Sequence, residues 1–469
     1  MSRVIVIGAG VAGLTAALRL ARAGVQVTLL TKGVGGLQLS QGTVDLLGYL
    51  PEERSLRSAE GRVSKGRSEK ESGASRLAPR ATSAVDSRVT EPLSAIAGLA
   101  VSDPKHPYAL IGVDGVRSGV SFLQAELGSL LVGELDHNRF FPTAVGAIRP
   151  TCLVQPSMLA GECVSGARFA IVGFRRLKDF HPELIAQNLA RTTLPDGGRL
   201  SARPVMIDVA ARDREIDSSG LTFARAFDDP EFRARFVAEL VPQLQDGETV
   251  GLPAVLGLKD ATAWSDIAER LGHPVFEIPL PPPSVPGMRL NTALMAAVRA
   301  AGVRVVNGSF VDTPVVKDGR LVSVSVEAAG GPHAFTADAF LLATGGFESG
   351  ALTLDSYGQV TERVFNLPLA GLDAQPLLHG DYWGSEQPLF KVGVAVDETM
   401  RVTTGDGSGA TGDGSGATGD GSEWSRVPSN LWAAGGILAG AVRWQEKSGE
   451  GIAVGSAVKA ADAIVEELG

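Results

Sequence analysis

The chain has 469 residues, a length of roughly three ordinary domains or of one large domain with a second domain inserted. Hydrophobic residues make up 44% and charged residues 20% of the chain, close to the globular average, which excludes a chain that is disordered throughout. The net charge of -9 argues against nucleic acid as a partner, because binding to a phosphate backbone needs concentrated Lys and Arg.

The number of cysteines and the lengths of the apolar stretches indicate in which cellular compartment the protein works. Cys152 and Cys163 are too few for a cysteine-ligated iron–sulfur cluster, a four-cysteine zinc site or a dense disulfide framework. We therefore expect a protein of the reducing cytoplasm. The apolar stretches Val4–Leu18 and Leu431–Val442 are shorter than the ~20 residues of a membrane span, and glycines interrupt both. We expect no membrane span and no signal peptide.

The first elements form a βαβ unit. Arg3–Ile7 is a β-branched run that predicts a strand, and apolar residues at helical spacing follow from Leu14 to Ala21. Gly24 ends this helix, and Val25–Leu30 predicts a second strand.

Three glycines, Gly8, Gly10 and Gly13, lie between the first strand and the helix. In this context the first glycine allows a tight turn, the second lets a pyrophosphate approach the backbone, and the third permits close packing of helix on strand. The helix N-terminus then offers unpaired N–H groups to the phosphate. The spacing predicts nucleotide binding; the alternative is a turn that only packs.

The end of the second strand lacks the acidic residue that usually binds an adenosine ribose. Thr31 and Lys32 occupy that place, and Lys32 either faces a phosphate or is solvated. This departure weakens the case for NAD and leaves room for FMN, which has no adenosine ribose. FAD stays open as the alternative, because other residues can hold the ribose.

A second glycine-rich loop follows at once, in the sequence K-G-V-G-G-L-Q-L-S-Q-G-T-V-D-L-L. Small residues let a flavin ring lie against backbone N–H groups, which stabilise a reduced, anionic flavin. An ordinary loop is the alternative. The candidate flavin-binding residues of this loop are Gly35, Gly36, Ser40, Gly42 and Thr43.

Two segments have the composition of mobile insertions. Residues 51–91 are rich in Ser, Arg, Glu and Gly and hold few large apolar residues, so they cannot bury enough surface to order themselves. Residues 404–422 repeat T-G-D-G-S-G-A. Asp406, Asp413 and Asp420 suggest calcium, but the seven-residue period differs from that of calcium-binding β-rolls, so we expect a flexible loop.

The second half of the chain again shows the alternation of helices and strands that is typical of a nucleotide-binding domain. Pro281–Pro283 and Pro286 predict a stiff connector, and Asn291–Ala301 predicts a helix. The strands expected next are Val303–Val306, two strands joined by the hairpin turn Lys317–Gly319, and the buried run Ala339–Ala343.

A third glycine cluster is split between two apolar strands that end in glycine. Ala339–Ala343 runs into Thr344 and Gly345, and Asn430–Leu468 predicts a strand, a glycine-rich turn and a long helix. The strand ends and helix starts of a doubly wound sheet converge on the ligand. An NAD dehydrogenase needs no such return of the C-terminal segment, so the pattern favours a flavin. The candidates of this segment are Gly435, Gly436 and Gly451.

These elements predict an α/β protein with a Rossmann-like FAD/NAD(P)-binding flavoprotein fold built from discontinuous segments. We assign residues 1–50, 287–350 and 429–469 to the flavin- or nucleotide-binding domain. Residues 100–286 and 351–400 then form an inserted α+β cap, or substrate, domain.

Several motifs beyond the glycine turn resemble one known family. They are S-Q-G-T-V-D-L-L at Ser40–Leu47, H-P-Y-A-L-I-G-V at His106–Val113, R-P-T at Arg149–Thr151, Q-P-S at Gln155–Ser157 and L-W-A-A-G-G-I-L-A-G near the end. Together they resemble the B subunit of the anaerobic glycerol-3-phosphate dehydrogenase. The resemblance covers most of the chain except residues 51–91 and the aspartate–glycine repeat.

The resemblance implies an FMN-containing subunit with two partners. One partner is the FAD-containing dehydrogenase subunit, and the other is an iron–sulfur, membrane-associated subunit. Such a complex oxidises sn-glycerol 3-phosphate to dihydroxyacetone phosphate and passes the electrons to quinone. The chain is then cytoplasmic and peripheral to the inner face of the cell membrane through its partners.

Substrate-side candidates follow from chemistry: a phosphate dianion favours Arg, and alcohol oxidation needs a base. The basic run Gly173–Pro182 offers His181 as the base, and a solvated face is the alternative. His106 is a similar candidate, and the FAD-containing partner is the other place for this chemistry. The cationic candidates are Arg149, Arg175, Arg176, Lys178 and Arg289.

Two other functions stay open at the level of sequence. One is a non-catalytic scaffold or electron-relay subunit, favoured by the missing ribose acid. The other is a stand-alone FAD oxidoreductase of the fumarate-reductase or aspartate-oxidase kind, whose glycine-rich loop after the second strand is similar.

Overall fold

The computed structural model describes residues 2–50, 88–308, 310–327, 331–380, 386–404 and 427–469. The insertion expected at residues 51–91 lies outside the described residues except for its last four, and the loop expected at 404–422 lies outside them except for Thr404.

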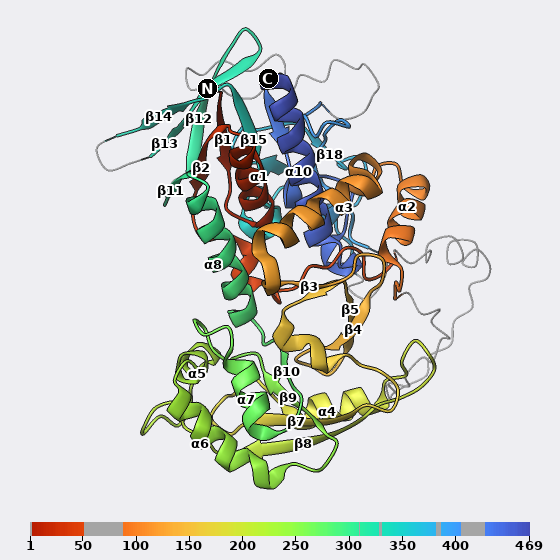
Figure 1. Ribbon diagram of the computed structural model, residues 1–469. Coiled ribbons are helices and arrows are strands. Elements are labelled where there is room, and N and C mark those ends of the chain that lie inside the picture. Colours follow the sequence, from red (N-terminus) through yellow and green to blue (C-terminus); the bar gives the residue numbers. More distant parts are fainter. Residues whose placement is uncertain (1, 51–87, 309, 328–330, 381–385, 405–426) are drawn as a thin grey trace, which may run out of the picture.

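A five-stranded parallel sheet lies at the centre of the upper lobe (Figure 1). Its strand order is β11-β2-β1-β15-β20, so segments far apart in the sequence become neighbours. A parallel sheet is covered on both faces, which is why its central strands are almost wholly apolar. The strands are β1 (Arg3–Ile7), β2 (Gln26–Thr31), β11 (Arg304–Asn307), β15 (Ala339–Leu342) and β20 (Leu431–Ala433). The strands expected in these places are thereby confirmed.

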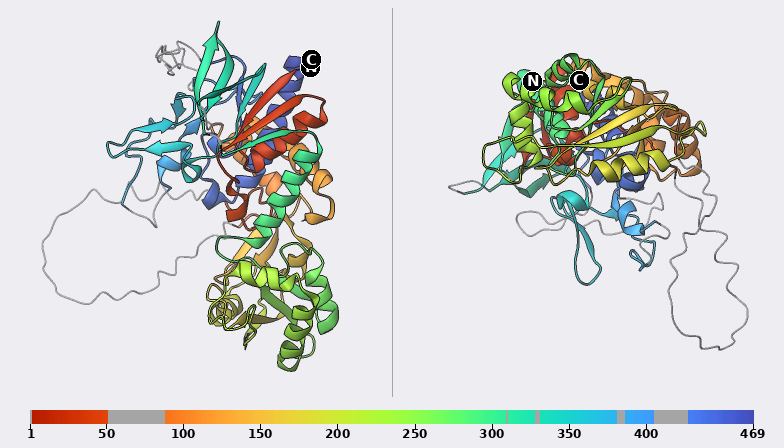
Figure 2. Two further views of the ribbon diagram at one scale, coloured as in Figure 1. Left: turned by 90° about the vertical axis from the view of Figure 1, so that its left-hand side faces the viewer. Right: turned by 90° about the horizontal axis from the view of Figure 1, so that it is seen from below.

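Helices cover one face of this sheet, and a three-stranded antiparallel sheet lies across its other face (Figure 2, left). The helices are α1 (Val11–Arg22), α3 (Pro107–Leu127), α8 (Val285–Ala300) and α10 (Gly449–Leu468). The antiparallel strands are β12 (Val311–Lys317), β13 (Arg320–Val326) and β14 (His333–Thr336). Asp318 and Gly319, with φ of 51° and 71°, form the expected hairpin turn between β12 and β13.

Helix α8 begins six residues before the expected Asn291, and so absorbs part of the proline connector. The Ser284 hydroxyl caps it by accepting the N–H of Gly287. Pro286 lies in the first turn, where a missing N–H costs nothing, so the prediction that Pro286 belongs to a connector is wrong.

The lower lobe in Figure 1 has its own parallel sheet, in the order β10-β9-β7-β8. Its strands are β7 (Arg168–Phe174), β8 (Ser201–Ile207), β9 (Thr249–Pro253) and β10 (Val275–Ile278). Its helices are α4 (Pro182–Arg191), α5 (Gly220–Phe227), α6 (Pro230–Leu240) and α7 (Ala263–Leu271). Phe174 lies at the centre of a buried aromatic cluster with Phe223, Phe227 and Phe236.

Short elements connect the two lobes and cover the edge of the upper one. The antiparallel pairs are β3 (Val132–Gly133) with β6 (Leu153–Val154), β4 (Arg139–Pro142) with β5 (Ile148–Thr151), β16 (Leu352–Leu354) with β17 (Val360–Glu362), and β18 (Leu369–Ala370) with β19 (Gly393–Val394). The remaining α-helices are α2 (Pro92–Ser102) and α9 (Arg443–Glu446). Short 3-10 turns span Gly36–Leu39, Gly128–Leu130, Pro156–Gly161, Val241–Gln243, Phe347–Ser349, Pro388–Lys391 and Gly435–Ile437.

Within the described ranges, none of the helices is both long enough and apolar enough to cross a bilayer.

Candidate functional site

The first glycine turn is packed so tightly that two of its positions accept only glycine. Gly8 has a φ of +113°, and a Cβ placed on it would lie 2.2 Å from the carbonyl oxygen of Ala343. A Cβ on Gly13 would lie 1.9 Å from the carbonyl oxygen of Gly8. The turn, the start of α1 and the end of β15 therefore touch through backbone atoms, as the fingerprint predicts.

Gly10 is different, because a Cβ on it would meet no other atom within 4 Å. It is the N-cap residue of α1, its backbone is extended, and no side chain caps the helix. The first N–H groups of α1 therefore have no capping side chain, and the space beside the Gly10 Cα is open. Such a helix start binds anions through its N–H groups and its dipole.

The other two glycine segments abut this turn. A Cβ on Gly35 would lie 2.4 Å from the carbonyl oxygen of Ala9, and one on Gly435 would lie 2.7 Å from Cβ of Ala12. Gly36, next to Gly35, faces open space. The loop after β2 and the turn after β20 thus lie against the start of α1, although they are about 400 residues apart in sequence.

A cavity of about 710 Å³ opens where these segments meet. Its walls come from the loop after β2, from the segment after β15 and from the segment between β20 and α10. Four residues that the sequence predicts for the site line it: Ser40, Thr43, Arg149 and Gly436. Most other predicted cofactor residues lie in the glycine turns beside it: Gly8, Gly10, Gly13, Gly36, Gly42, Thr344, Gly345 and Gly435.

Gly42 and Gly451 make room for neighbouring elements. Gly42 has a φ of +72°, and a Cβ on it would lie 2.5 Å from the carbonyl carbon of Pro286. A Cβ on Gly451 would lie 2.3 Å from the hydroxyl of Tyr108. Both glycines therefore shape the walls around the cavity from behind.

A buried ion pair forms one side of the cavity. Arg149 Nη1 lies 2.6 Å from Asp45 Oδ2 and donates a second hydrogen bond to Thr43 Oγ1 at 3.1 Å. Arg149 Nε and Gln41 Oε1 are buried and have no hydrogen-bond partner among the described residues. Buried polar atoms nearly always have partners, so these two atoms favour a polar ligand in this cavity.

Glu450, in the first turn of α10, gives the cavity a titratable group near neutral pH. Burial raises the pKa of its carboxyl, and the negative charge of Asp45 raises it further, to about 7. Arg149 and Lys447 act in the opposite direction but do not cancel these two causes. A carboxyl with a pKa close to the working pH is suited to accept and release protons.

Sequence reasoning missed Glu450 and the two cations that join it. Arg443 lies on α9, and its Nη2 is 3.1 Å from Glu348 Oε1. Lys447 follows α9 in a left-handed conformation and has no side-chain partner within the part of the chain that the structure describes. The available signal was a cluster of four charged residues, Arg443, Glu446, Lys447 and Glu450, just before and at the start of a helix that opens on glycines.

The basic run of the cap does not reach the cavity. His181 is the exposed N-cap residue of α4, in the lower lobe. Arg175 is exposed and lies 4.0 Å from Asp208, which also pairs with Arg176 at 2.9 Å. Lys178 Nζ donates to the carbonyl oxygen of Arg175 at the surface. The structure therefore does not bring His181 or Arg175 to the other predicted site residues.

Lys32 and His106 also lie apart from the cavity lining. Lys32 is exposed, with Nζ 5.7 Å from the ring centroid of Phe310, and Thr31 bonds to Gly33. His106 Nε2 lies 3.0 Å from Glu446 Oε2, and both side chains are buried. His106 therefore links the start of α3 to α9 and has no access to a ligand.

Arg289 is committed to a buried contact between the lobes. Its Nη1 lies 2.6 Å from Glu277 Oε2, and its other donors bond to the carbonyl oxygens of Leu256 and Gly257. Side-chain exposure is 9% for Arg289 and 0% for Glu277. No donor is left over for a substrate phosphate.

We expect Arg289→Met to lower the free energy of unfolding by about 3–5 kcal/mol, because it leaves the Glu277 carboxylate buried without its counter-charge. Urea denaturation measures this change. Arg299→Met is the matched control, since Arg299 is exposed on the same helix. Equal stability of the two variants would contradict a structural role for Arg289.

Fold and site together define a nucleotide-binding α/β protein of the flavoprotein class: a parallel sheet with three glycine turns gathered at one edge. The family model described as "FAD binding domain" matches residues 3–74 and 63–452. The chain is 30% identical over 473 residues to the probable B subunit of the anaerobic glycerol-3-phosphate dehydrogenase of Halobacterium salinarum (strain ATCC 29341 / DSM 671 / R1), covering 100% of this chain and 98% of that one. It therefore belongs to the FAD binding domain family and, within it, to the family of anaerobic glycerol-3-phosphate dehydrogenase B subunits, which confirms the resemblance seen in the sequence.

Other relatives also match this chain over nearly its whole length. The B subunit of the anaerobic glycerol-3-phosphate dehydrogenase of Yersinia pseudotuberculosis serotype I (strain IP32953) is 28% identical over 99% of this chain and 98% of its own. Among solved structures, the open conformation of a flavocytochrome c3 fumarate reductase is similar, with a TM-score of 0.40 and 12% identity over 99% of this chain and 78% of that one.

Proposed function

We propose that this chain is an FMN-containing subunit that oxidises sn-glycerol 3-phosphate to dihydroxyacetone phosphate and passes the electrons through partner subunits to quinone. The names of its relatives support the substrate and an assembly of several subunits. The observation that carries the proposal is the cavity beside the three glycine turns, which combines three cations with a carboxyl whose pKa is about 7.

The residues around the glycine turns fit a flavin. The open start of α1 at Gly10 suits a phosphate, with Gly8 and Gly13 keeping the backbone close. We propose Gly36, Ser40, Gly42 and Thr43 on one side of the flavin. Thr344, Gly345, Gly435, Gly436 and Gly451 are proposed for the other.

The flavin type rests on the end of β2. Thr31 and Lys32 lie where an acidic residue usually binds the adenosine ribose, and the Thr31 hydroxyl already bonds to Gly33. Lys32 is exposed and free to face a phosphate. We therefore propose FMN, with FAD as the alternative. Either flavin supplies the same chemistry when bound, the acceptance of a hydride equivalent from the substrate carbon.

The cations of the cavity are placed to bind the substrate phosphate. Arg443 and Lys447 lie on adjacent segments between β20 and α10, and Lys447 forms no ion pair among the described residues. Arg149, on β5, contributes its unpartnered Nε. Arginine binds phosphate through two parallel hydrogen bonds, and lysine adds a point charge.

Oxidation of a secondary alcohol removes a hydride from carbon and a proton from the hydroxyl group. We assign the proton to Glu450, because its carboxylate lines the cavity and its raised pKa makes it a stronger base than an ordinary glutamate. Asp45, paired with Arg149, supplies the negative field that raises the pKa of Glu450. His181 and Arg175, which the structure leaves on the cap surface, have no part in this proposal.

The relatives are named as one subunit of an assembly. We propose two partners, an FAD-containing dehydrogenase subunit and an iron–sulfur, membrane-associated one. The iron–sulfur partner would hold this chain in the cytoplasm at the inner face of the membrane. Co-purification of the three chains in a membrane fraction, lost when the iron–sulfur partner is deleted, is the expected result.

The decisive experiment releases the cofactor by heat and identifies it by mass, and then follows flavin bleaching by glycerol 3-phosphate without oxygen. We expect FMN, and bleaching by glycerol 3-phosphate but not by glycerol, which lacks the phosphate. Colourless protein that regains no absorbance with FMN or FAD would refute the proposal. A bound flavin that the substrate leaves oxidised would instead assign the chain an electron-relay role.

A further inference from the structure

His106 and Tyr108 of the H-P-Y motif have no part in the function proposed above, yet both are buried beside the segment that carries Glu450. His106 is the N-cap residue of α3, and its Nδ1 accepts the backbone N–H of Tyr108 at 3.1 Å. A ring nitrogen that accepts a hydrogen bond carries no proton, so the proton of this neutral ring is on Nε2. Nε2 therefore donates to Glu446 Oε2, which lies 3.0 Å away.

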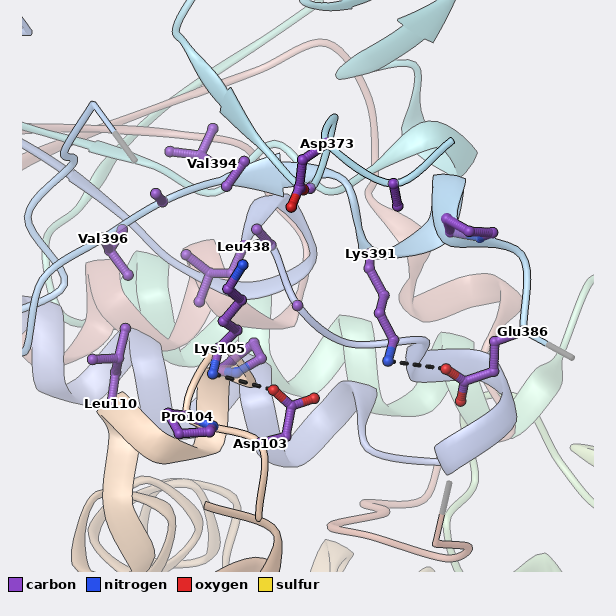
Figure 3. Close-up of a pocket in the computed structure, with 18 of the residues that line it drawn as sticks. Asp103, Pro104, Lys105, Leu110, Asp373, Glu386, Lys391, Val394, Val396 and Leu438 are labelled. Carbon is purple, nitrogen blue, oxygen red and sulfur yellow. Dashed lines mark hydrogen bonds and ion pairs between the residues drawn. The ribbon is translucent and has the colours of Figure 1, made fainter. Parts of the chain in front are cut away.

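The turn before α3 fixes the position of His106. Asp103 Oδ1 accepts the backbone N–H of Lys105 at 3.2 Å, a contact drawn as a dashed line in Figure 3. The carbonyl oxygen of Asp103 accepts the backbone N–H of His106 at 3.0 Å. Gly440 packs against this turn so closely that a Cβ on it would lie 2.2 Å from the carbonyl oxygen of Lys105. His106 is therefore held in place by its own segment, independently of Glu446.

Glu446 is the buried residue of the short helix α9. Besides His106, two groups donate to its carboxylate: the Ser448 hydroxyl to Oε2 and the backbone N–H of Val442 to Oε1, both at 2.8 Å. Burial raises the pKa of Glu446, but the contacts with these three residues outweigh burial and hold the pKa below its usual range. The carboxylate is therefore ionised, and a buried charge is stable only while its donors stay in place.

The segment around Glu446 carries three charged residues of the candidate site. Arg443, Lys447 and Glu450 line the cavity, whereas Glu446 does not. A helix of four residues is not stable by itself, and Lys447 after it has a φ of 54°, in the left-handed region that disfavours a lysine. Contacts with the rest of the chain must therefore keep this shape. They gather on Glu446, whose carbonyl oxygen also accepts two backbone hydrogen bonds from the loop after β2, at 2.8 and 3.0 Å.

Tyr108 makes a parallel contact with the start of α10. Its hydroxyl contacts the carbonyl oxygens of Leu46 and Ser448, the second at 3.2 Å. Ser448 is the N-cap residue of α10, and Leu46 follows Asp45, whose carbonyl oxygen accepts the backbone N–H of Gly451 at 3.0 Å. The motif thus contacts both chain segments on which the position of Glu450 relative to Asp45 depends.

We propose that His106, acting through Glu446, is the positioning residue that holds the three charged residues of this segment toward the cavity. The inference rests on the function proposed above, because these three residues are the ones assigned there to the phosphate and to the proton of the substrate.

Two variants separate the two hydrogen bonds of His106. In His106→Gln the amide nitrogen lies where Nε2 lies and can still donate to Glu446. In His106→Asn the amide oxygen replaces Nδ1 as the cap of α3, but no donor reaches Glu446. His137→Asn, at an exposed histidine, is the matched control.

The first measurement is turnover of glycerol 3-phosphate by the flavin-loaded variants, as a function of pH and below their melting temperatures. We expect His106→Asn to raise KM at least about tenfold, because the cations are misplaced. Its kcat/KM should begin to fall at a lower pH than the parent's value of about 7, since Glu450 leaves the burial and the charge of Asp45 that raise its pKa. His106→Gln and His137→Asn should keep the parental KM and pH profile.

The second measurement needs no substrate. Trypsin cleaves after Lys447, and the mass of the released fragment follows the rate of this cut. We expect the cut to be at least about tenfold faster in His106→Asn, because local opening of α9 is easier, and parental in His106→Gln.

Parental KM and pH profile in His106→Asn, or equal losses in His106→Asn and His106→Gln, would overturn the proposal. If glycerol 3-phosphate is oxidised by neither the parent nor the variants, the proposed function fails, and the tryptic cut decides alone. Faster cleavage of His106→Asn only would then support the anchoring of α9, and equal cleavage of all variants would overturn it.

Discussion

Replacement of Glu450 by Gln is expected to lower turnover of glycerol 3-phosphate by about 100- to 10,000-fold, the usual contribution of a general base. The amide has nearly the shape of the carboxyl but cannot accept the hydroxyl proton. Flavin content should stay unchanged. The fold should also survive, because burial and Asp45 already disfavour the ionised form of this carboxyl. Reduction of an artificial acceptor measures the effect.

The pH profile separates a base from a merely structural carboxyl. With its pKa at about 7, Glu450 is mostly protonated below that pH and mostly ionised above it. The parent kcat/KM should therefore fall tenfold per pH unit below about 7 and level off above it, and Glu450→Gln should lose this limb. Glu466→Gln, an exposed position on the same helix, is the control. A full acid limb in Glu450→Gln would assign the base to another residue.

Replacement of Gly10 by Asp is expected to abolish flavin binding while leaving the fold intact. A Cβ at this position meets no protein atom within 4 Å, and Asp is a favoured N-cap residue, so α1 should gain stability. Its charge, however, would lie where we place the flavin phosphate. Two negative charges 4 Å apart repel by about 4 kcal/mol at an effective dielectric constant of 20, close to a thousandfold in affinity.

Flavin titration of the apoprotein and its thermal melting temperature measure the two halves of this prediction. Gly10→Asn is the matched control, because it caps the helix with the same shape but no charge. We expect it to bind flavin better than Gly10→Asp. Full flavin occupancy in Gly10→Asp would place the phosphate elsewhere.

The sheet and its glycine turns could be predicted because their signals are local. The strand β1, the turn at Gly8 and the helix α1 follow each other directly, and each has its own pattern. The strands β15 and β20 are recognisable as apolar runs that end in glycine. That their glycine ends meet the turn after β1 follows from the rule that strand ends of a doubly wound sheet converge; in the sheet, β15 lies next to β1 and β20 next to β15.

The charged residues of the cavity could not be predicted in the same way. Glu450, Arg443 and Lys447 have no period and no motif of their own, and their meeting depends on how α9 and α10 pack against the loop after β2. For Arg289 the sequence led to the opposite error, a predicted site residue that has a structural role. Its residue type suggested phosphate binding, but Glu277, which takes up its charge, comes from a strand of the other lobe.

Residues 391–394 and 438–440, which run side by side through backbone hydrogen bonds, depend on close backbone contact. A Cβ on Gly393 would lie 2.6 Å from the carbonyl oxygen of Ile437, and one on Gly440 would lie 2.2 Å from that of Lys105. A side chain at Gly393 or Gly440 would therefore push the two segments apart, and Val392, which lines the candidate flavin cavity, lies on one of them.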